Sequence, residues 1–495
     1  MEKGLTTFLL ILLSIGSIVV FQSVTAKAQS KTIIVPDDYP TIASAIGNAT
    51  NDDTIFIKKG VYEEHTLTIV KSVTVIGENR DNTVIKNIDQ PTQLFDSSIF
   101  IGPTAIKINA DYVTISGLTI SSNGTAIGGG GFKTLITNNK LDGITLDKGS
   151  YQTIVSNIIT SINCRASFTY IVNNILNATY SILAVYSPSS NNVIYHNTIS
   201  AVNITSKLDV AGINGIYVSD SSNNLLAKNV VSNGGVGILL DVSSISNNVI
   251  GNTVLNGFVG LAVIRESRNN VFYANVVENN TSAVSIAGSN NRFYGNNFLN
   301  YSKTTESADR IAGPNPSYSK AIWDNGNQGN FWSNYSAKYP NTPYVIDESN
   351  VDEYPLFSPF DQEVIISLPK WLPPLITTIS PEYQKYNEDK IDVTFAVNKF
   401  SSLSYSIDWK ENVSITGNTT IEIMTNGLHS ITLYANDSYG NTFSQTTTFA
   451  VEKSLLENIG NPLIISTIAI PVVILFLAVG LLLYRRHRKT ANLKH

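Results

Sequence analysis

The chain has 495 residues, a formal net charge of −5, a hydrophobic fraction of 43% and a single cysteine, Cys164. One cysteine excludes an internal disulfide, so stability must come from a buried core, and we expect Cys164 to be part of that core. The excess of acidic residues disfavours nucleic acid as a partner, because its phosphates would be repelled.

The two ends of the chain predict export and membrane anchoring. Residues 1–28 contain an early lysine, an apolar run and an Ala-Lys-Ala triplet, the pattern of a cleaved signal peptide. Residues 462–484 carry no charge and are long enough to cross a hydrocarbon core of roughly 30 Å. Residues 485–495 form a basic tail that should remain cytoplasmic. We therefore expect a single-pass protein of the cell membrane with a large exterior domain.

The exterior part is more acidic than the whole chain. The end segments contain seven of the 33 basic residues and one of the 38 acidic residues, which leaves 26 basic against 37 acidic residues, a balance of −11. A surface of this charge also repels acidic polysaccharides unless cations bridge the two.

Internal repeats predict an all-β solenoid. The motif apolar-x-x-Asn-x-apolar recurs with gaps of 17 to 32 residues, several of them 23. A period near 23 with short β-branched segments is typical of stacked coils, here about ten of them. We expect each repeated asparagine to turn a corner in the left-handed conformation and to hydrogen-bond to its equivalent in the next coil. These asparagines are Asn139, Asn157, Asn174, Asn197, Asn229, Asn252, Asn275 and Asn296.

The domain boundaries follow from the repeats and from changes in composition. We place the solenoid with its N-terminal cap at residues 29–317, an aromatic-rich C-terminal cap at 318–360 and a linker at 361–374. A helix candidate from Pro40 to Ile46 belongs to the N-terminal cap. Turn-punctuated strands at 375–453 predict a small antiparallel β-sandwich.

Three stretches resemble a known family. They are IIVPDDYPTIASAIGNATNDDTIFIKKGVYEE (33–64), the SNNVIYHNTI-type repeats, and AIWDNGNQGNFWSNY with NTPYVIDESNVDEYPLFSPF (321–335 and 341–360). Together they resemble NosD-like secreted proteins, which implies a right-handed parallel β-helix of the pectin-lyase-like fold over roughly residues 31–360. The segment Leu433–Asn441 is similar to a strand and turn of immunoglobulin-like stalk modules, which implies a spacer between the β-helix and the membrane.

The resemblance implies metal chemistry that the residues do not support well. Copper prefers clustered His, Cys or Met donors, whereas His65, His196, His429, Cys164 and Met424 are scattered along the exterior part. Relatives often carry an acidic calcium loop in the cap, and here the equivalent interval, residues 336–341, is short and lacks acidic residues. We expect no bound cofactor, with copper disfavoured and calcium left open.

Two groups of residues are weak candidates for a site. Asp220, Asp241, Arg265 and Glu266 follow strands of consecutive coils, where carboxylates and an arginine could converge on a sugar or form ion pairs at a turn. Tyr195, Tyr273 and Tyr294 should form an outward stripe that either stacks on sugar rings or packs on itself. His196 lies where other coils have Lys, Gly or Ala, so we expect it to face solvent.

Eleven Asn-x-Ser/Thr motifs are candidate glycosylation sites. They are Asn48, Asn123, Asn177, Asn203, Asn279, Asn280, Asn300, Asn334, Asn412, Asn418 and Asn436.

Three functions remain open. The first is a non-catalytic cell-surface protein with a structural role or a carbohydrate-binding role. The second is a carbohydrate-active enzyme, a lyase or a glycoside hydrolase, on the same fold. The third is a NosD-like accessory protein for copper-site assembly.

Overall fold

The computed structural model describes residues 30–93, 100–178, 183–201, 213–305, 320–336 and 342–453, together with residues 479 and 481. The predicted signal peptide, the cytoplasmic tail, nearly all of the predicted span and Asn203 therefore lie outside the described residues. Within the described ranges, no helix is both long enough and apolar enough to cross a membrane.

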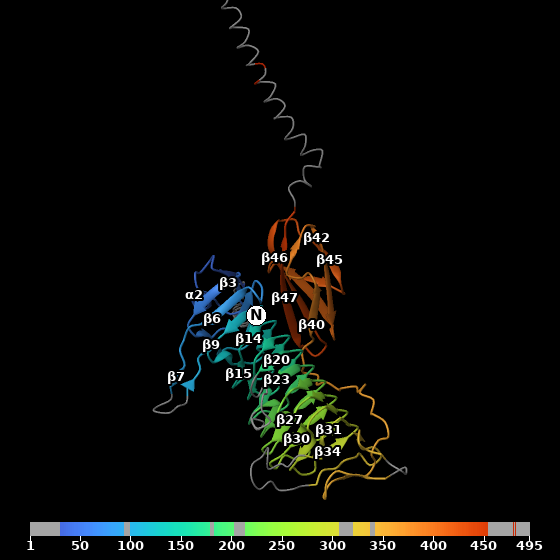
Figure 1. The fold of residues 1–495 in the computed structure, drawn as a ribbon. Helices are drawn as coiled ribbons and strands as arrows, with labels where there is room; N and C mark the ends of the chain where they lie inside the picture. The colour runs from blue at the N-terminus through green and yellow to red at the C-terminus, as the bar shows by residue number, and fades with distance from the viewer. Residues whose placement is uncertain are drawn as a thin grey trace, which may run out of the picture.

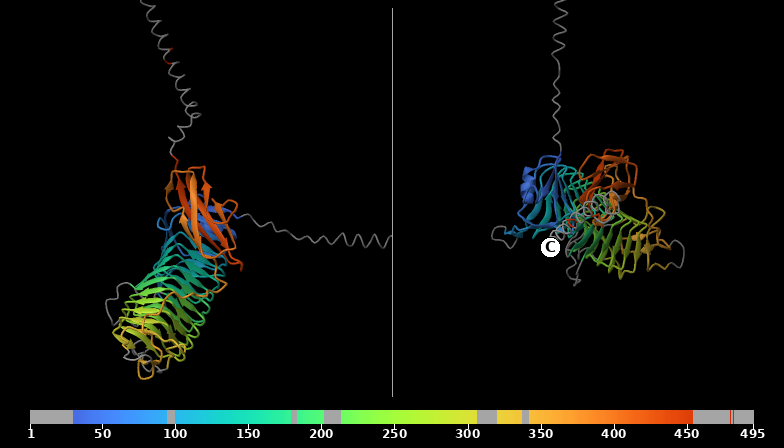
Figure 2. Two further views of the ribbon diagram at one scale, coloured as in Figure 1. Left: turned by 90° about the vertical axis from the view of Figure 1, so that its right-hand side faces the viewer. Right: turned by 90° about the horizontal axis from the view of Figure 1, so that it is seen from above.

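The predicted solenoid is confirmed as a parallel β-helix (Figures 1 and 2). Each coil contributes one strand to each of three parallel sheets, and equivalent strands of successive coils pair in register, as Ile194 pairs with Leu226 and Ile199 with Val231. The described part of sheets 1, 2 and 3 has 12, 12 and 11 strands, respectively.

The strands of the three sheets have the following bounds. Sheet 1 contains β1 (Thr32–Val35), β2 (Thr54–Ile57), β5 (Thr74–Gly77), β10 (Thr114–Ser116), β13 (Leu135–Thr137), β16 (Thr153–Val155), β19 (Tyr170–Val172), β22 (Val193–Tyr195), β25 (Leu225–Ala227), β28 (Asn248–Ile250), β31 (Val271–Tyr273) and β34 (Arg292–Tyr294). Sheet 2 contains β3 (Gly60–Glu64), β6 (Thr83–Asn87), β11 (Thr119–Ser121), β14 (Lys140–Leu141), β17 (Ile158–Ile159), β20 (Ile175–Ala178), β23 (Thr198–Ala201), β26 (Val230–Ser232), β29 (Thr253–Leu255), β32 (Val276–Glu278), β35 (Asn297–Leu299) and β37 (Phe331–Trp332). Sheet 3 contains β4 (Leu67–Ile69), β9 (Thr104–Ile108), β12 (Thr125–Gly129), β15 (Ile144–Leu146), β18 (Ile162–Cys164), β21 (Leu183–Val185), β24 (Asn214–Ser219), β27 (Val236–Asp241), β30 (Val259–Val263), β33 (Ser282–Ile286) and β36 (Lys303–Thr305).

The apolar columns of the repeat fill the interior of the β-helix. Ile194 in sheet 1 and Ile199 in sheet 2 are fully buried, as are Val249 and Phe272 in later coils. Residues alternate between the two faces of a strand, so the apolar residue at each of these inward positions stacks on its equivalent one coil away. Cys164 also lies in this core, as expected, and burial raises the pKa of its thiol to about 11.

Both open ends of the core are covered. Helix α2 (Ile42–Asn48) follows its N-cap Thr41 and buries Ile42, Ala45 and Ile46 against the first coils. At the other end, Trp332 stacks on Phe298 with ring centroids 4.3 Å apart, and its own cap neighbour Tyr344 stacks on it at 4.6 Å. The inward columns thus continue into the cap, which includes the short pair β38 (Tyr344–Val345) and β39 (Val351–Asp352).

The asparagine ladder is present, but its geometry differs from the expectation. The left-handed residue is the one before each ladder asparagine: φ is +55° at His196 and +56° at Lys228, whereas Asn197 and Asn229 are not left-handed. The asparagine is instead fully buried, and its Oδ1 accepts the backbone and side-chain N–H of the preceding rung. The left-handed position therefore accepts varied residues, such as His196, Lys228 and Ala274, because the buried amide, not the turn, requires asparagine.

The ladder is longer than predicted and ends on a carboxylate. Asn296 donates to the Oδ1 of Asn330 in the cap, at 3.1 Å from the backbone and 2.8 Å from the side chain. Asn330 in turn donates to Asp352 Oδ2 from its backbone N–H at 2.8 Å and from its Nδ2 at 3.2 Å. Trp332 Nε1 adds a third bond to the same oxygen at 2.9 Å. Every rung points its N–H groups toward this end, and Asp352 receives the last of them.

A second ladder occupies the corner between sheets 3 and 1. Asn224 donates to Asn247, Asn247 to Asn270 and Asn270 to Asn291, each through both backbone and side-chain N–H at 2.8–3.0 Å. Each of these residues belongs to an Asn-Asn pair and lies five positions before an asparagine of the first ladder. The sequence analysis missed this ladder although the pairs recur visibly.

Residues 376–451 form two packed sheets. One contains β40 (Ile376–Ser380), β42 (Lys390–Val397) and β45 (Thr419–Glu422), and the other contains β41 (Lys385–Tyr386), β47 (Thr442–Val451), β46 (Gly427–Asn436), β43 (Ser402–Ile407) and β44 (Val413–Ile415). We call this module the sandwich. Its immunoglobulin-like character stays a prediction.

The sandwich lies alongside the β-helix (Figure 2). Its core is continuous with outward residues of sheet 1, including Val172 and Val193. Near the N-terminal coils, the ring of Trp409 lies 5.1 Å from that of Phe56, and the hydroxyl of Tyr383 contacts Glu78 Oε1 at 3.1 Å. A sandwich that served only as a spacer beyond the end of the β-helix would not share this interface with its side wall.

Candidate functional site

The predicted line of charged residues is built around one buried carboxylate. Asp241 at the end of β27 is fully buried. Its carboxylate accepts hydrogen bonds from Arg265 Nε at 2.6 Å, the Tyr217 hydroxyl at 2.9 Å and the Val242 backbone N–H at 2.8 Å. Arg265 Nη2 also pairs with Asp241 Oδ2, and these bonds raise the pKa of Arg265. Both carboxylate oxygens are thus occupied in holding a turn.

Asp220 and Glu266 do not join this pair. Both are exposed and, like Arg265, have left-handed backbones with φ of +46° and +62°. Among the described residues, neither carboxylate bonds to Asp241 or Arg265. The structure therefore brings together two of the four predicted residues, and it shows no pair of facing carboxylates at this edge.

The predicted tyrosine stripe is largely used for packing. Tyr273 and Tyr294 stack on each other with centroids 4.6 Å apart, and Phe360 from the end of the cap lies 5.6 Å from Tyr273. Tyr195 packs against the core shared with the sandwich. His196 beside it is exposed, as expected, and partial burial together with Lys228 lowers its pKa.

A cavity that the sequence analysis did not anticipate lies between the β-helix and the sandwich. Its volume is about 320 Å³, within the range of small-ligand pockets. The β-helix side is lined by Tyr112, Thr114, Lys133, Thr134, Leu135, Tyr151 and Thr153, and the other side by Trp371, Pro373, Tyr434, Asn436, Gly440, Asn441, Thr442, Phe443 and Ser444. Exposed residues at its rim, such as Tyr112 at 57%, leave it open to solvent.

One wall of the cavity is a column of aromatic rings from successive coils. Tyr112, Tyr151 and Phe168 occupy equivalent left-handed corner positions before sheet 1, which aim their side chains outward. Phe132 lies between them, 5.5 Å from Tyr112 and 5.6 Å from Tyr151. Trp371 stands edge-on against Tyr151 at 5.7 Å and against Phe168 at 5.8 Å. The column therefore continues from the β-helix into the linker.

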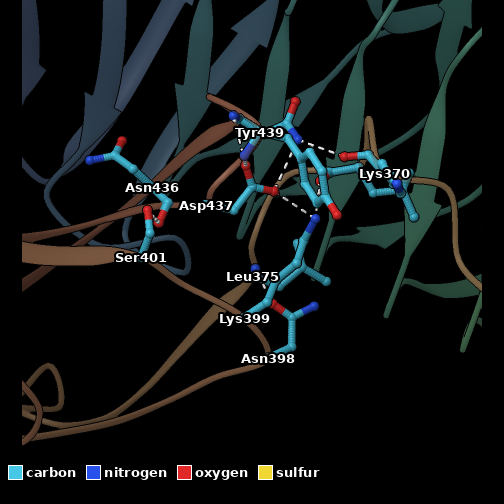
Figure 3. Close-up of polar contacts among 10 residues, drawn as sticks. Lys370, Leu375, Asn398, Lys399, Ser401, Asn436, Asp437 and Tyr439 are labelled. Carbon is cyan, nitrogen blue, oxygen red and sulfur yellow. Dashed lines mark hydrogen bonds and ion pairs between the residues drawn. The ribbon is translucent and has the colours of Figure 1, made fainter.

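A network of polar contacts, which we call the linker clamp, holds the backbone on both sides of Trp371. Figure 3 shows Asp437 and Lys399 of this network. The linker clamp consists of Asp437, Lys399 and Asn441. Asp437 Oδ2 accepts hydrogen bonds from Lys399 Nζ at 2.7 Å and from Asn441 Nδ2 at 2.9 Å. Lys399 also donates to the Leu372 carbonyl at 2.6 Å, and Asn441 donates to the Lys370 carbonyl at 2.8 Å. The backbone is thus fixed on both sides of Trp371.

The electrostatics of the clamp follow from its hydrogen bonds. Burial acts to raise the pKa of Asp437, but the bonds from Asn441 and Lys399 outweigh it and lower the pKa to about 2. The carboxylate is therefore ionised at any ordinary pH. Lys370 adds a cation–π contact, with its Nζ 5.3 Å from the Tyr439 ring centre.

The cavity offers aromatic faces and hydrogen-bonding groups to a ligand. Aromatic faces can stack on the apolar faces of a ligand, while Lys133, Asn436 and Asn441 can hydrogen-bond to hydroxyls or carboxylates. The lining contains no Asp, Glu, His or Cys, and its titratable side chains are Lys133, Tyr112, Tyr151 and Tyr434.

No metal centre is visible in the described part of the chain, where no three His, Cys, Asp or Glu side chains are grouped to hold an ion. His65 pairs with Asp89 at 2.7 Å and His429 with Asp408 at 2.9 Å, each in a separate structural contact. The predicted histidine donors are therefore not brought together, and most of the cap interval considered for calcium lies outside the described residues.

Comparisons with known proteins agree with the fold and with the resemblance. Residues 170–337 match the sequence model of the family described as periplasmic copper-binding protein (NosD). A cell surface glycoprotein of Methanothermus fervidus is 32% identical over 159 residues, which cover 27% of this chain and 25% of the relative. The chain thus matches about a quarter of the length of that relative.

Solved structures that resemble this chain include a tailspike protein, an epimerase module and an exopolygalacturonase. The Dettilon tailspike protein has a TM-score of 0.40 and 15% identity, covering 83% of this chain and 91% of its own. The A-module of a mannuronan C-5 epimerase from Azotobacter vinelandii has a TM-score of 0.36 and 13% identity, covering 57% of this chain and 91% of its own. An exopolygalacturonase from Thermotoga maritima has a TM-score of 0.34 and 10% identity, covering 56% and 85%. From its own sheets and the family match, the chain is a parallel β-helix protein with a NosD-like segment at residues 170–337.

Proposed function

We propose that this protein is displayed on the cell surface and binds a glycan, without cleaving it, in the cavity between the β-helix and the sandwich. The observation that carries the proposal is the composition of that cavity: an aromatic column, several amides and hydroxyls, one lysine and no carboxylate. Sugar rings present apolar C–H faces and many hydroxyls, so a wall of rings with hydrogen-bonding groups at its edges suits them.

The absence of a carboxylate from the lining supports binding over glycoside hydrolysis in this cavity. Glycoside hydrolysis generally requires two carboxyl groups on either side of the bond that is cleaved. The best acidic candidate of the sequence analysis, Asp241, is buried and fully bonded to Arg265, Tyr217 and Val242. A carbohydrate-active enzyme is therefore the weaker alternative.

Surface display rests on two supports. The ends of the chain have the patterns of a signal peptide and of a membrane span, and a relative of part of the chain is a cell surface glycoprotein.

The test uses the full-length protein in lipid nanodiscs on a glycan array, followed by calorimetry with the best-retained oligosaccharide. Tyr112→Ala should weaken binding at least about tenfold, because Tyr112 is the most exposed ring of the column and contributes a stacking face. Alanine retains the Cβ that the left-handed position already accommodates, so the fold should be preserved.

The matched control is Tyr354→Ala, which removes a tyrosine that is 46% exposed in the C-terminal cap, away from the cavity. It should leave the affinity unchanged. New reducing ends or unsaturated products that disappear in Asp241→Ala would contradict the non-catalytic proposal, and equal loss of affinity in both tyrosine variants would contradict the site.

Copper binding is a second proposal, supported by the description of the matching family. Calorimetric titration of the full-length protein with Cu²⁺ tests it. A site tighter than about micromolar would support an accessory role in copper handling, and weaker binding would remove it.

A further inference from the structure

The three corners of the coil have different compositions. The corner between sheets 1 and 2 contains the first asparagine ladder, and the corner between sheets 3 and 1 contains the second. The third corner, between sheets 2 and 3, does not border sheet 1 and so lies away from the sandwich and the cavity. This corner is where the candidate glycosylation motifs of the coils gather.

The positions of the motifs show the bias. Every described Asn-x-Ser/Thr motif beyond the N-terminal helix and before the sandwich lies in a sheet 2 strand or directly after one. Asn177 lies within β20, and the others follow β11, β32, β35 and β37. The residues of this corner are Asn123, Asn177, Asn279, Asn280, Asn300 and Asn334.

Exposure divides these six asparagines. All are exposed except Asn280, which is 3% exposed. Its Nδ2 donates to the carbonyls of Val254 at 3.1 Å and Glu278 at 3.0 Å, and its Oδ1 accepts the N–H of Gly257 at 2.8 Å. Asn280 therefore has a structural role. Its motif, Asn280-Thr281-Ser282, nevertheless fits the glycosylation pattern as well as the motif of Asn279 does.

Four of the five exposed members have an amide nitrogen that makes no hydrogen bond to the described residues, and the amide nitrogen of Asn300 donates one long bond at the surface. Asn123, Asn177 and Asn279 make no side-chain hydrogen bond to the described residues. Asn334 uses only its Oδ1, which accepts the hydroxyl of Tyr344 at 2.8 Å. Asn300 has a long surface contact of 3.4 Å with Glu278 Oε1.

The left-handed backbone conformation explains why asparagine occurs at some positions of this corner. It does not explain the Thr or Ser two positions later, which completes the glycosylation motif. Asn256, Asn279 and Asn300 are equivalent left-handed residues, with φ of +58°, +58° and +49°. Only Asn279 and Asn300 are followed two positions later by Thr or Ser, whereas Asn256 is followed by Gly257 and Phe258. The hydroxyl residue is an addition that the turn does not need.

We propose that the corner between sheets 2 and 3 is a glycan-bearing edge, with N-linked sugars on Asn123, Asn177, Asn279, Asn300 and Asn334 and none on Asn280. The donor is a lipid-phosphate-linked oligosaccharide. Asparagine Nδ2 forms a bond to the anomeric carbon, the bond from that carbon to the phosphate oxygen breaks, and its electron pair stays on the lipid phosphate. The Nδ2 proton is released to a base of the transferase. The glycans cover one edge and leave the cavity beside sheet 1 free.

The experiment is glycopeptide mass spectrometry on the full-length protein from membranes of a host that glycosylates a reporter glycoprotein. Sugar should be found on the five exposed asparagines and absent from Asn280 and from the control Asn256. Thr281→Ala should abolish the sugar on the 279–280 peptide, because it removes the acceptor motif of Asn279 while the motif of Asn280 retains Ser282.

Persistence of the sugar in Thr281→Ala would place it on Asn280 and overturn the proposal. Unmodified peptides for all five exposed corner asparagines in that host would also overturn it. Neither result depends on whether the cavity binds a ligand.

Discussion

At the residue scale, the ladder asparagines satisfy buried backbone groups that the sharp corners would otherwise leave unpaired. Asn252 accepts two bonds from Asn229 and donates to Asn275 and to the Leu226 carbonyl, all at 2.8–3.0 Å. A residue without an amide in this position leaves several buried donors and acceptors unsatisfied, and each such group costs about 1–3 kcal/mol.

We therefore expect Asn252→Ala to lower the free energy of unfolding by at least about 2 kcal/mol in urea titrations. His196→Ala is the control, because it changes an exposed residue that only precedes a rung, and it should alter stability by less than about 0.5 kcal/mol. A similar effect of both changes would mean that the rungs are not the stabilising feature.

The contribution of Asp352, the terminal carboxylate of the ladder, to stability depends on pH, and the direction of its pKa shift gives the sign of that dependence. Burial raises the pKa of Asp352 in the folded protein, although the bonds from Trp332 and Asn330 oppose this. The folded state then holds the proton more tightly than the unfolded state, whose pKa is about 3.9. The contribution of Asp352 to stability therefore declines as the pH rises from about 4 through the folded-state pKa.

Asp352→Asn should remove this decline. The melting temperature of the variant minus that of the wild type should increase between about pH 4 and pH 7. Glu348→Gln, which changes an exposed carboxylate of the same cap, serves as the control for the loss of charge. A difference that stays constant across this range would show that Asp352 titrates as an unperturbed group.

At the element scale, the sequence period predicts the features that recur in every coil, but it does not predict features that occur only once. Ile194, Ile199 and Asn197 were assigned correctly to core and ladder, since stacked coils repeat their environment. The left-handed conformation was placed one residue too late, because the corner residue varies and leaves no sequence signal. The cavity was not predicted, because Tyr112 and Tyr434 are distant in the sequence and meet only when the sandwich docks. A tryptophan in the predicted linker, Trp371, is a local signal that could have indicated that the linker packs against another surface.

The linker clamp is the element that should control this docking. Lys399→Met removes the bonds to Asp437 and to the Leu372 carbonyl, so we expect limited proteolysis between residues 361 and 375 to become at least several times faster. Lys385→Met is the control, because its partner Glu452 is 62% exposed and such surface pairs contribute little. Equal cleavage rates in both variants would show that apolar packing alone holds the linker.

At the scale of the whole molecule, the direction of β47 indicates how the β-helix is oriented relative to the predicted membrane span. Thr442 at its start lines the cavity beside Tyr112, and Thr448 near its end bonds to the carbonyl of Glu78, closer to the N-terminal coils. The described sandwich therefore ends beside the N-terminal coils (Figure 1), eight residues before the predicted span. The C-terminal cap should then project outward, roughly 50 Å from the N-terminal coil at 4.8 Å per coil.

Fluorescent labels on single cysteines test this orientation in nanodiscs with a headgroup quencher. Ala43→Cys on α2 should be quenched strongly and Ser349→Cys in the C-terminal cap weakly, since both positions are exposed but lie at opposite ends. The native Cys164 is buried with a raised pKa and should not react with the label. Equal quenching of both labels would indicate that the β-helix lies flat on the membrane.

The one-way bonding of the ladders has a consequence for how such a protein changes in length. Each ladder asparagine accepts hydrogen bonds from the asparagine of the preceding coil and donates hydrogen bonds to the asparagine of the following coil. Every interior coil therefore offers the same two interfaces. Deletion of the 23 residues from 230 to 252 would join Asn229 to Thr253 and leave both neighbouring coils with compatible partners. The reach of the protein from the cell can thus be altered in whole steps of one coil, while both caps and the docked sandwich remain as they are.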